Sequence, residues 1–366
     1  MTGRFLHKVF SPTLAIALFD WPCTTIRVAI TTEGLTAGSL AAELDAGGSR
    51  FLATVLDASG GEVSRLFFND TVKGSQNYTI AQFSADAPAG NFTVELAKLT
   101  EASYFIADLS MNQSVATFYG LHATGVVAFA KQPPPRPARR IEFFGASDTA
   151  GFGVDGQPKV WDCLLHMVKY ESCVESYSSL LARQLDAEMH LQAWSGKGLI
   201  KNAVNILPSS GPPLPAYVNR SLATDWSAAT TWQWSSWTPD LIVVSLGGND
   251  YNNIEVPTEP VFRAAYHALL DSLFEGYAYA ASAPAIANIC GGGSHADPSR
   301  NRACPFVKNS SMSYQQEHPT RKVNYIEVPV GVVGDDDIAC LGHHDPAGQQ
   351  KFADYLGPKL KAMMGW

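Results

Sequence analysis

The chain has 366 residues, 46% of them hydrophobic and 16% charged, and a formal net charge of −8. This length suits two domains, each large enough to bury a hydrophobic core. The negative charge, without basic clusters, argues against nucleic acid or an anionic membrane as a partner, and no apolar stretch reaches the roughly 20 residues that span a bilayer.

Residues 1–131 have the pattern of an all-β domain. Short runs rich in Val, Phe and Thr are separated by clusters of Gly, Asp, Asn and Ser, which is typical of strands joined by turns. The predicted strands are Ile26–Thr32, Phe51–Leu56, Arg65–Phe68, Phe92–Leu96, Tyr104–Leu109 and Gly125–Phe129. Many short strands with polar turns predict a β-sandwich or jelly roll, in which we find no catalytic constellation.

A proline-rich segment at residues 132–138 marks the predicted domain boundary. Successive prolines exclude a helix and favour stiff, extended chain. Over residues 139–366 apolar strands alternate with helical patterns, which predicts an α/β domain with a mostly parallel sheet covered by helices. The expected strands are Ile141–Phe144, a strand in Leu191–Gly198 that ends in a glycine turn, Asp240–Leu246, Ile286–Ile289 and Val323–Val328.

Three helices are predicted in the same part of the chain. Ser176 is expected to cap a helix whose apolar residues follow helical spacing. A second helix runs from Thr258 to Gly276, with Thr258 as its cap, and a third closes the chain through about Met363. Residues 208–239 are predicted to form a surface excursion, and the loop at 290–320 is long enough to be either functional or mobile.

Potential glycosylation sites and cysteines indicate the compartment. Six Asn-x-Ser/Thr sequons occur where about two are expected by chance, and this excess predicts a secreted, extracellular eukaryotic glycoprotein. The sequons begin at Asn69, Asn77, Asn91, Asn112, Asn219 and Asn309. Six cysteines fit the same compartment. Two pairs could form local bridges, Cys163 with Cys173 and Cys290 with Cys304, which leaves Cys23 and Cys340 without an assigned partner.

Four residues of the α/β part have the chemistry that ester hydrolysis by serine requires. Such a serine needs a base that takes its proton, donors that face the oxygen that becomes negative, and a group that orients the base. Ser147 is the candidate nucleophile, in a Gly-rich turn just after a strand, where an open α/β sheet presents its ligands. His343 is the candidate base, and the oxyanion hole is assigned to the N–H groups of Ser147 and Gly196 and the side chain of Asn249. No Cys-x-x-Cys or His-x-x-x-His spacing indicates a metal, and we expect no cofactor.

These residues stand in sequence blocks that resemble those of the SGNH (GDSL-type) hydrolases, which are named after Ser, Gly, Asn and His. The blocks are Gly145-Ala-Ser147, Ser195-Gly196-Lys-Gly198, Leu246-Gly-Gly-Asn249-Asp250 and His343-x-x-Pro346-x-Gly348, in the family's order. Within that group the chain most resembles carbohydrate esterase family 2, which joins an N-terminal jelly roll to a three-layer α/β/α SGNH domain. Local matches to family 2 are Phe19-Asp-Trp-Pro22, Lys98-Leu-Thr-Glu101, Phe118-Tyr-Gly-Leu121, Ala193-Trp-Ser-Gly-Lys-Gly-Leu199 and Trp237-Thr-Pro-Asp240.

The sequence departs from the family's pattern at two places. Ala146 replaces the Asp of the usual Gly-Asp-Ser block, which we expect to cost stability or rate without abolishing the chemistry. Cys340 and Leu341 stand where an Asp usually orients the histidine, so the sequence suits a Ser–His dyad in which a main-chain carbonyl holds the imidazole. The run Asp335-Asp336-Asp337 is interpreted as a solvated loop, and Asp345 is a poorer candidate for the orienting residue.

Some assignments keep an alternative. His344 competes with His343 as the base, although the spacing of the last block matches the family at His343. Gly198 competes with Gly196 as a donor. Trp194 and Tyr251 flank two blocks, and each is either a wall of a sugar-binding site or an ordinary core residue.

The resemblance implies a serine esterase that removes O-acetyl groups from plant-type polysaccharides, such as acetylated xylan or glucomannan, through an acetyl-enzyme intermediate. The expected substrate is an acetylated polysaccharide or oligosaccharide, and we expect no nucleic-acid or membrane partner and a monomeric protein. One alternative is an SGNH lipase or thioesterase that acts on another acyl group. A second alternative, motivated by Ala146 and the absent Asp, is a carbohydrate-binding protein with weakened catalysis.

Overall fold

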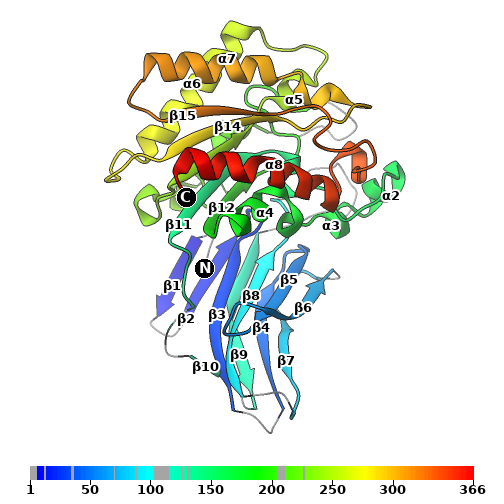
Figure 1. The fold of residues 1–366 in the computed structure, drawn as a ribbon. Helices are drawn as coiled ribbons and strands as arrows, with labels where there is room; N and C mark the ends of the chain where they lie inside the picture. The colour runs from blue at the N-terminus through cyan, green and yellow to red at the C-terminus, as the bar shows by residue number, and fades with distance from the viewer. Residues whose placement is uncertain are drawn as a thin grey trace. The chain divides into compact units, whose positions relative to one another are not determined.

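The computed structural model describes most of the chain (Figure 1). The described residues are 6–11, 14–33, 37–69, 71–86, 89–102, 115–125, 127–130, 132, 134–203, 211–225 and 227–366. The predicted strand Tyr104–Leu109 and the sequon at Asn112 lie outside them. The described residues divide into two compact units, one up to Arg136 together with Ser221–Thr230, and one made of Pro137–Arg220 and Thr231–Trp366.

The first unit contains two antiparallel sheets of five strands each, among the residues that the structure describes. One sheet has the order β1 (Leu6–Ser11), β2 (Leu14–Phe19), β9 (Ala116–Thr124), β4 (Gly38–Asp45), β7 (Gln76–Phe83). The other has the order β10 (Val127–Phe129), β3 (Thr25–Thr32), β8 (Gly90–Lys98), β5 (Phe51–Leu56), β6 (Glu62–Phe68). Apolar residues of both sheets share one core, for example Ile30 and Val94 of the second sheet with Leu40 and Ile80 of the first. This is the predicted sandwich.

Several strands of this sandwich were missed from the sequence. β4 reads Gly-Ser-Leu-Ala-Ala-Glu-Leu-Asp, and its alternate residues Leu40, Ala42 and Leu44 are buried. Alanine, glycine and acidic residues have low β-propensity, so only this alternation indicates a strand. The structure shows that packing against the facing sheet outweighs the weak local preference.

Asp20 holds the segment Ser221–Thr230 within the first unit. Its carboxylate is almost fully buried and accepts hydrogen bonds from Thr224 N at 2.9 Å and Thr224 Oγ1 at 2.7 Å. The buried ammonium of Lys98 donates to the carbonyl oxygens of Asp20, Thr100 and Glu101 at 2.6–2.9 Å. Part of the predicted excursion at 208–239 is therefore an ordered component of the sandwich unit.

The second unit is built on a five-stranded, all-parallel sheet with helices on both faces (Figure 1). The strand order is β12 (Ala187–Ala193), β11 (Arg139–Gly145), β13 (Leu241–Ser245), β14 (Ala285–Gly291), β15 (Val323–Val328). Helices α6 (Glu259–Gly276) and α7 (Cys304–Glu317) cover one face, and α4 (Tyr177–Gln184) and α8 (Pro346–Met364) cover the other. The strands are nearly continuous apolar runs, as expected of strands buried on both faces. The three layers agree with the predicted α/β fold.

Three predictions of element boundaries need correction. The strand placed within Leu191–Gly198 begins at Ala187 and ends at Ala193. Ser176 caps α4 as predicted, by accepting from Ser179 N, whereas the hydroxyl of Thr258 makes no capping bond at the start of α6. The loop at 290–320 contains the helix α7, whose buried face includes two serines and therefore lacks the apolar periodicity that would have revealed it.

None of the helices that the structure describes combines the length and hydrophobicity that crossing a bilayer requires.

Candidate active site

Ser147 occupies the turn that joins β11 to the short helix α1 (Ser147–Ala150). Gly145 ends the strand, and a Cβ there would collide with the Thr149 side chain. Gly151 and Gly153 follow with positive φ angles of 78° and 64°, a region that glycine adopts without strain. As the first helical residue, Ser147 has no partner for its N–H inside the helix.

His343 lies against Ser147. Its Nε2 is 2.7 Å from Ser147 Oγ, and its Nδ1 is 3.0 Å from the main-chain oxygen of Cys340. The aromatic ring of Phe152 packs edge-on against the imidazole, with ring centroids 4.7 Å apart. Because a carbonyl oxygen only accepts hydrogen bonds, the contact with Cys340 places the proton on Nδ1 and leaves Nε2 free to accept from the serine.

Burial is the main influence on the protonation of His343. It lowers the pKa of the imidazole below 6.5, because the charged form loses hydration. The carboxylate of Asp148 acts in the opposite direction, and the guanidinium of Arg300 adds to the lowering. His343 is therefore neutral at pH 7, the state that a general base requires.

The segment Ala339–His344, here called the histidine loop, presents the imidazole. Ala339 N donates to His343 O at 2.7 Å, and His343 N donates to Cys340 O at 3.0 Å. Leu341 and Gly342 both have positive φ, 53° and 76°, so the loop makes a tight left-handed turn just before the histidine. The main-chain oxygen of Cys340 accepts from both the amide and the ring of His343, which fixes the ring orientation.

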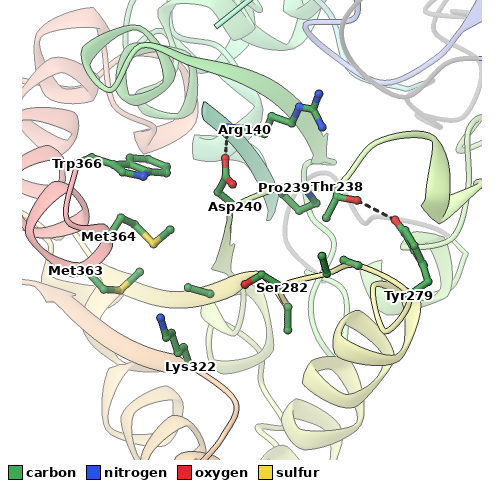
Figure 2. A pocket seen from close by; sticks show the side chains of 14 residues that line it. Arg140, Thr238, Pro239, Asp240, Tyr279, Ser282, Lys322, Met363, Met364 and Trp366 are labelled. Carbon is green, nitrogen blue, oxygen red and sulfur yellow. Dashed lines mark hydrogen bonds between the residues drawn. The ribbon is translucent and has the colours of Figure 1, made fainter. Parts of the chain in front are cut away.

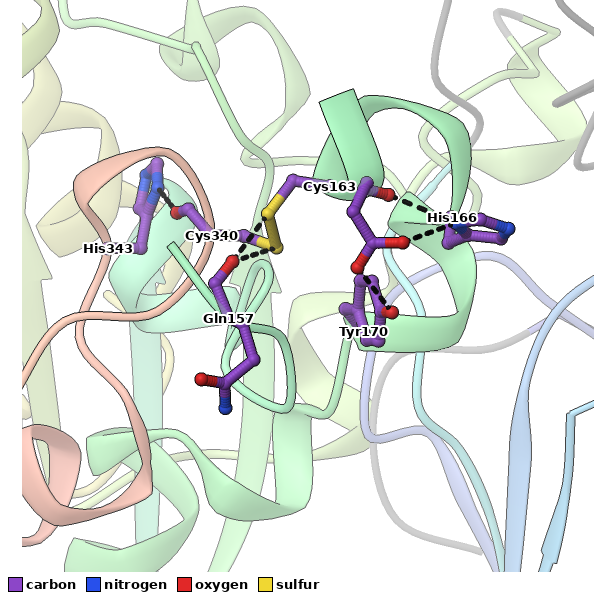
Figure 3. The surroundings of a disulfide bond; sticks show 7 residues. Gln157, Cys163, His166, Tyr170, Cys340 and His343 are labelled. Atoms are coloured by element: carbon purple, nitrogen blue, oxygen red, sulfur yellow. Dashed lines mark hydrogen bonds and ion pairs between the residues drawn. A yellow bond between two sulfur atoms is a disulfide. The ribbon is translucent and has the colours of Figure 1, made fainter. Parts of the chain in front are cut away.

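A disulfide anchors the histidine loop, and it corrects one predicted pairing. Cys340 is bonded to Cys163 of helix α2 (Val160–Leu165), with a Cα–Cα distance of 5.5 Å (Figure 3). The expected local bridge from Cys163 to Cys173 is wrong, because the turns of α2 and α3 (Met167–Tyr170) between them leave Cys163 facing the histidine loop. The other expected bridge, Cys290–Cys304, is confirmed.

An ion pair that the sequence did not reveal lies beside the serine. Asp148 contacts Arg300 Nη1, and Arg300 Nη2 donates to the main-chain oxygen of Gly342 at 2.7 Å. Burial alone would raise the pKa of Asp148, but Arg300, His344 and His343 together hold this pKa well below its ordinary value. The position of Asp148 directly after Ser147 could have indicated its place in the site. Arg300 lies within the long 290–320 segment, where no sequence pattern indicated that it approaches the site.

The glycine and asparagine blocks lie at the same edge of the sheet as Ser147. β11 pairs with β12 and β13 so that Gly145 is level with Ala193 on one side and Ser245 on the other. Gly196 follows β12 with a φ of 73°, and Asn249 belongs to α5 (Gly248–Tyr251) directly after β13. Three of the predicted blocks therefore begin at neighbouring carboxyl ends of parallel strands, the usual position of ligand sites in such sheets.

Hydrogen bonds join these two blocks to each other. Asn249 Nδ2 donates to Lys197 O at 2.8 Å, which leaves its second amide hydrogen for another acceptor. The carboxylate of Asp250, which is fully buried, accepts from the backbone N–H groups of Leu199, Ile200 and Lys201 at 2.7–2.8 Å. Burial raises the pKa of Asp250, and these three bonds oppose the rise. The alternative donor Gly198 is buried, and its N–H already donates to Asn202 Oδ1 at 3.2 Å. A Cβ at this position would collide with the main-chain oxygen of Lys201.

The two predicted sugar-binding aromatics have different surroundings. Trp194 is half-buried, and its ring packs edge-on against Tyr217 at 5.2 Å. Tyr251 is only 6% exposed, stacks on Phe306 at 4.2 Å and belongs to the core. Tyr251 thus fits the alternative interpretation as a core residue, while sugar contact by Trp194 stays a prediction.

The buried side chain of Lys197 lies next to the rings of Trp194 and Tyr217. Lys197 Nζ lies 4.7 Å from the ring centre of Trp194 and 5.1 Å from that of Tyr217, and it donates to Pro212 O at 3.0 Å. Burial lowers the pKa of this ammonium to about 8. The sequence analysis did not single out Lys197, although its place between two glycines of the block was visible.

The alternative residues near the C-terminus have structural partners. His344 is buried, its Nε2 lies 2.9 Å from Gly292 O, and burial lowers its pKa to about 4, so it is neutral at pH 7. Asp345 caps α8 by accepting from Gly348 N at 2.8 Å. Asp335 and Asp336 are exposed as expected of a solvated loop, but Asp337 is not, since it is buried and pairs with Lys351 at 2.5 Å.

A pocket of about 560 Å³ lies at the other edge of the same sheet (Figure 2). Its polar lining includes Arg140, Asp240 and Lys322, which stand at the amino ends of β11, β13 and β15. None of the predicted site residues lines it. Parallel strands separate their amino and carboxyl ends, so this pocket is remote from Ser147. Among the described residues no group of three His, Cys, Asp or Glu side chains is arranged to hold a metal ion.

Two curated proteins with stated activities are similar to the chain. It is 28% identical over 236 residues to a cellulase/esterase (CelE) of Acetivibrio thermocellus, a match covering 63% of this chain and 26% of the relative. It is 28% identical over 147 residues to an acetylxylan esterase/glucomannan deacetylase of Cellvibrio japonicus, covering 39% of this chain and 38% of the relative. The matched parts thus span well under half of each relative. No protein-family model matches the chain.

Solved structures with the same fold extend over the whole chain. A family 2 carbohydrate esterase from Clostridium thermocellum, solved with cellohexaose, has a TM-score of 0.78 and 21% identity, covering 100% of this chain and 98% of that one. An acetyl xylan esterase from Butyrivibrio proteoclasticus has a TM-score of 0.77 and 18% identity, covering 100% and 96%. The family 2 esterase from Cellvibrio japonicus has a TM-score of 0.74 and 20% identity, covering 100% and 95%.

The fold defines the class of architecture, an α/β unit with a parallel sheet and a separate jelly-roll-like sandwich unit, as in solved family 2 carbohydrate esterases. Within that class, the resemblance to carbohydrate esterase family 2 that the sequence predicts is confirmed. Both curated relatives are named as esterases, in agreement with the predicted enzyme class, a carboxylic ester hydrolase.

Proposed function

We propose that this protein is a serine esterase that removes O-acetyl groups from plant-type polysaccharides such as acetylated xylan or glucomannan. The observation that carries the proposal is the contact between Ser147 Oγ and His343 Nε2 at 2.7 Å, with Nδ1 on a main-chain carbonyl oxygen. The names of the curated relatives support an acetylated polysaccharide as the substrate, and the cellohexaose in a structure of the same fold supports an extended sugar chain.

In the proposed reaction His343 accepts the hydroxyl proton of Ser147 as the serine oxygen attacks the acetyl carbonyl carbon. The negative oxygen of the tetrahedral intermediate is stabilised by the N–H groups of Ser147 and Gly196 and by the side chain of Asn249. Cleavage of the ester bond releases the sugar hydroxyl, which takes its proton from His343. Water, deprotonated by His343, then attacks the acetyl-enzyme, and acetate leaves as the proton returns to the serine.

Ser147 and His343 act as a dyad in this proposal. A third residue normally holds the base in one tautomer and one orientation. Here the main-chain oxygen of Cys340 supplies that contact, and the packing of Phe152 against the ring restricts its rotation. A neutral carbonyl stabilises the imidazolium less than a carboxylate would, and Asp148 supplies negative charge nearby.

Acetate release from acetylated xylan, glucomannan and an aryl acetate tests the proposal. We expect Ser147→Ala to lower the rate by at least about 10³-fold, because the nucleophile is removed while the fold is kept. A chain-length series of aryl esters tests the acyl group, and activity should fall sharply beyond acetyl. A Ser147→Ala protein with the full rate would refute the mechanism, and an unchanged rate on long acyl chains would favour the lipase or thioesterase alternative.

We further propose a secreted, monomeric glycoprotein with an esterase domain at 139–366, joined by the linker 132–138 to the sandwich at 1–131. The sequon asparagines within the described residues are all exposed, which supports glycan attachment; they are Asn69, Asn77, Asn91, Asn219 and Asn309. A mass decrease after treatment of the protein from a eukaryotic host with an N-glycosidase tests this. A secreted product without any such decrease would contradict it.

A further inference from the structure

Arg300 contacts an immediate neighbour of each residue of the candidate dyad. It lies on the short helix η5 (Pro298–Asn301), inside the loop that the Cys290–Cys304 disulfide closes. Its Nη1 pairs with Asp148, the residue after the candidate nucleophile. Its Nη2 donates at 2.7 Å to the main-chain oxygen of Gly342, the residue before the candidate base. The side chains of Arg300 and Asp148 are about one-fifth exposed, 19% and 21%.

We propose that Arg300 is a positioning residue of the proposed esterase, and that its guanidinium holds the Ser147 turn and the histidine loop at the separation that proton transfer requires. The inference rests on the proposed function. Arg300 is assigned no contact with the reacting atoms. It acts through Asp148 on one side and through Gly342 on the other.

The chemistry of the guanidinium suits this bridging role. Its planar fork directs two nitrogens along fixed directions, so one side chain binds a carboxylate and a carbonyl oxygen simultaneously. A lysine ammonium is a single point charge on a flexible stem and does not reproduce that geometry. The histidine loop needs such support because Leu341 has a positive φ of 53°, a conformation that a residue other than glycine holds only when surrounding contacts fix it.

The backbone that carries Arg300 is itself fixed. The Asp297 side chain accepts from Ser299 N at 3.0 Å at the start of η5. Asn301 accepts from Gly293 N at 2.9 Å and donates to Val328 O at 3.0 Å, which ties the loop to the end of β15. The Cys290–Cys304 disulfide closes the loop at its base. Arg300 therefore extends from a rigid support to the Ser147 turn and the histidine loop, and it adds a charged link to the direct packing between them.

The charges around His343 provide a readout that simple structural support would not give. The titratable or charged side chains that face it are Asp148, Arg300 and His344. Asp148 raises the pKa of His343, and Arg300 lowers it. Removal of the positive charge at 300 should therefore move the acid limb of the kcat/KM profile to higher pH, and removal of the negative charge at 148 should move it to lower pH.

The test compares full-length Arg300→Met, Arg300→Lys and Asp148→Asn proteins with wild type, using an aryl acetate and acetylated xylan. We expect Arg300→Met to lower kcat roughly 10- to 100-fold with little change in the aryl acetate KM, because misplaced reacting groups slow the chemical step. Its acid limb should move up in pH, and that of Asp148→Asn should move down. Arg300→Lys keeps the charge, so its acid limb should stay near wild type while kcat falls.

Arg302→Met is the matched control. Arg302 lies in the same disulfide-closed loop and is exposed, so its removal should leave kcat and the pH profile at wild-type values. An Arg300→Met protein with wild-type kcat and an unmoved acid limb would overturn the inference. An Arg300→Lys protein with the kcat of wild type would also overturn it, because a positive charge alone, without the guanidinium geometry, would then maintain the rate.

Two further measurements keep the outcome interpretable. Arg300→Met leaves the half-buried Asp148 without its guanidinium partner, so thermal unfolding is measured in parallel. If that protein does not fold, the double variant Asp148→Asn with Arg300→Met replaces it. The double variant leaves no unpaired charge and should show the same loss of kcat. Ser147→Ala separates the two proposals. Full activity of that variant refutes the proposed function, whereas an inactive Ser147→Ala beside a fully active Arg300→Met refutes only the role of Arg300.

Discussion

His343 combines three features at the scale of single residues: a half-buried ring, a main-chain acceptor at Nδ1 and a serine hydroxyl at Nε2. Burial lowers its pKa, and the carbonyl of Cys340 fixes its tautomer without adding a second titrating group. An imidazole in this state acts as a base over a wider acid range than an exposed histidine does.

The pH dependence of kcat/KM follows from this environment. Protonation removes the base, so activity is lost as pH falls through the pKa of His343, and that pKa lies below 6.5. We expect the acid limb of kcat/KM for an aryl acetate to be half-maximal below pH 6.5. His166→Gln, which changes an exposed histidine paired with Asp162, should leave this limb unchanged. An inflection at or above pH 6.5 in the wild type would contradict the assignment.

Asn249 tests the oxyanion hole at the same scale. Asn249→Ala removes one donor and the bond to Lys197 O, and we expect kcat to fall by about 10²- to 10³-fold with a smaller change in KM. Asn252→Ala is a suitable control, because that exposed asparagine ends the same short helix. A kcat for Asn249→Ala within a few-fold of wild type would remove Asn249 from the oxyanion hole.

At the scale of elements, the turn after β11 and the histidine loop fit against each other without space between them. A Cβ on Gly153 would lie 2.5 Å from Cys340 Cβ, and a Cβ on Gly156 would collide with Cys340 Sγ. The glycines that follow the serine thus permit close approach of the loop that carries His343. This gives a physical reason for glycine at these positions beyond the needs of the turn itself.

Gly153→Ala tests that close approach. The substitution adds strain from a positive φ of 64° and displaces Cys340, whose carbonyl orients His343. We expect a loss of more than about 1 kcal/mol in the free energy of unfolding and a clear decrease in kcat. Gly365→Ala provides the comparison, because Gly365 has a similar φ of 69° with open space around it. Equal stability losses, with no change in kcat for Gly153→Ala, would contradict the expectation.

At the scale of the whole molecule, disulfides connect distant parts of the α/β unit. The Cys163–Cys340 bond closes a sequence separation of 177 residues, and Cys290–Cys304 closes one of 14. Cross-links that close long segments restrict the unfolded chain more than those that close short ones. The longer bridge also fixes the residue that supplies the acceptor for His343, so it joins global stability to local geometry (Figure 3).

Removal of the two bridges in separate double variants checks this reasoning. Cys163→Ala with Cys340→Ala should lower the free energy of unfolding by roughly 2–5 kcal/mol, and more than Cys290→Ala with Cys304→Ala does. Denaturant unfolding of both variants measures the difference. The first variant should also lose kcat, because the histidine loop loses its covalent anchor. A larger loss of stability from the shorter bridge would contradict the argument.

Local sequence signals were sufficient for the elements that depend on local chemistry. The apolar run before Gly145 predicted β11, and Ser176 predicted the start of α4. The same signals failed for elements that are stabilised mainly by tertiary packing. Helix α7 buries Ser310 and Ser311, and strand β4 buries alanine beside leucine, so neither has a clear apolar pattern. Cysteine pairing depends on which Cα atoms approach each other, so the partner of Cys163 was not readable from its spacing to Cys173.

The sequence by itself determined the order of the four blocks, the residue types that ester chemistry needs and the alternation of strands and helices, because each of these depends on a few adjacent residues. Only the tertiary structure decided that Ser147 and His343 meet across 196 positions of chain, that Nδ1 of His343 contacts the carbonyl of Cys340, and that Arg300 joins Asp148 to Gly342. These contacts depend on strand order, register and loop conformation, which are set by the packing of the entire α/β unit rather than by any short segment.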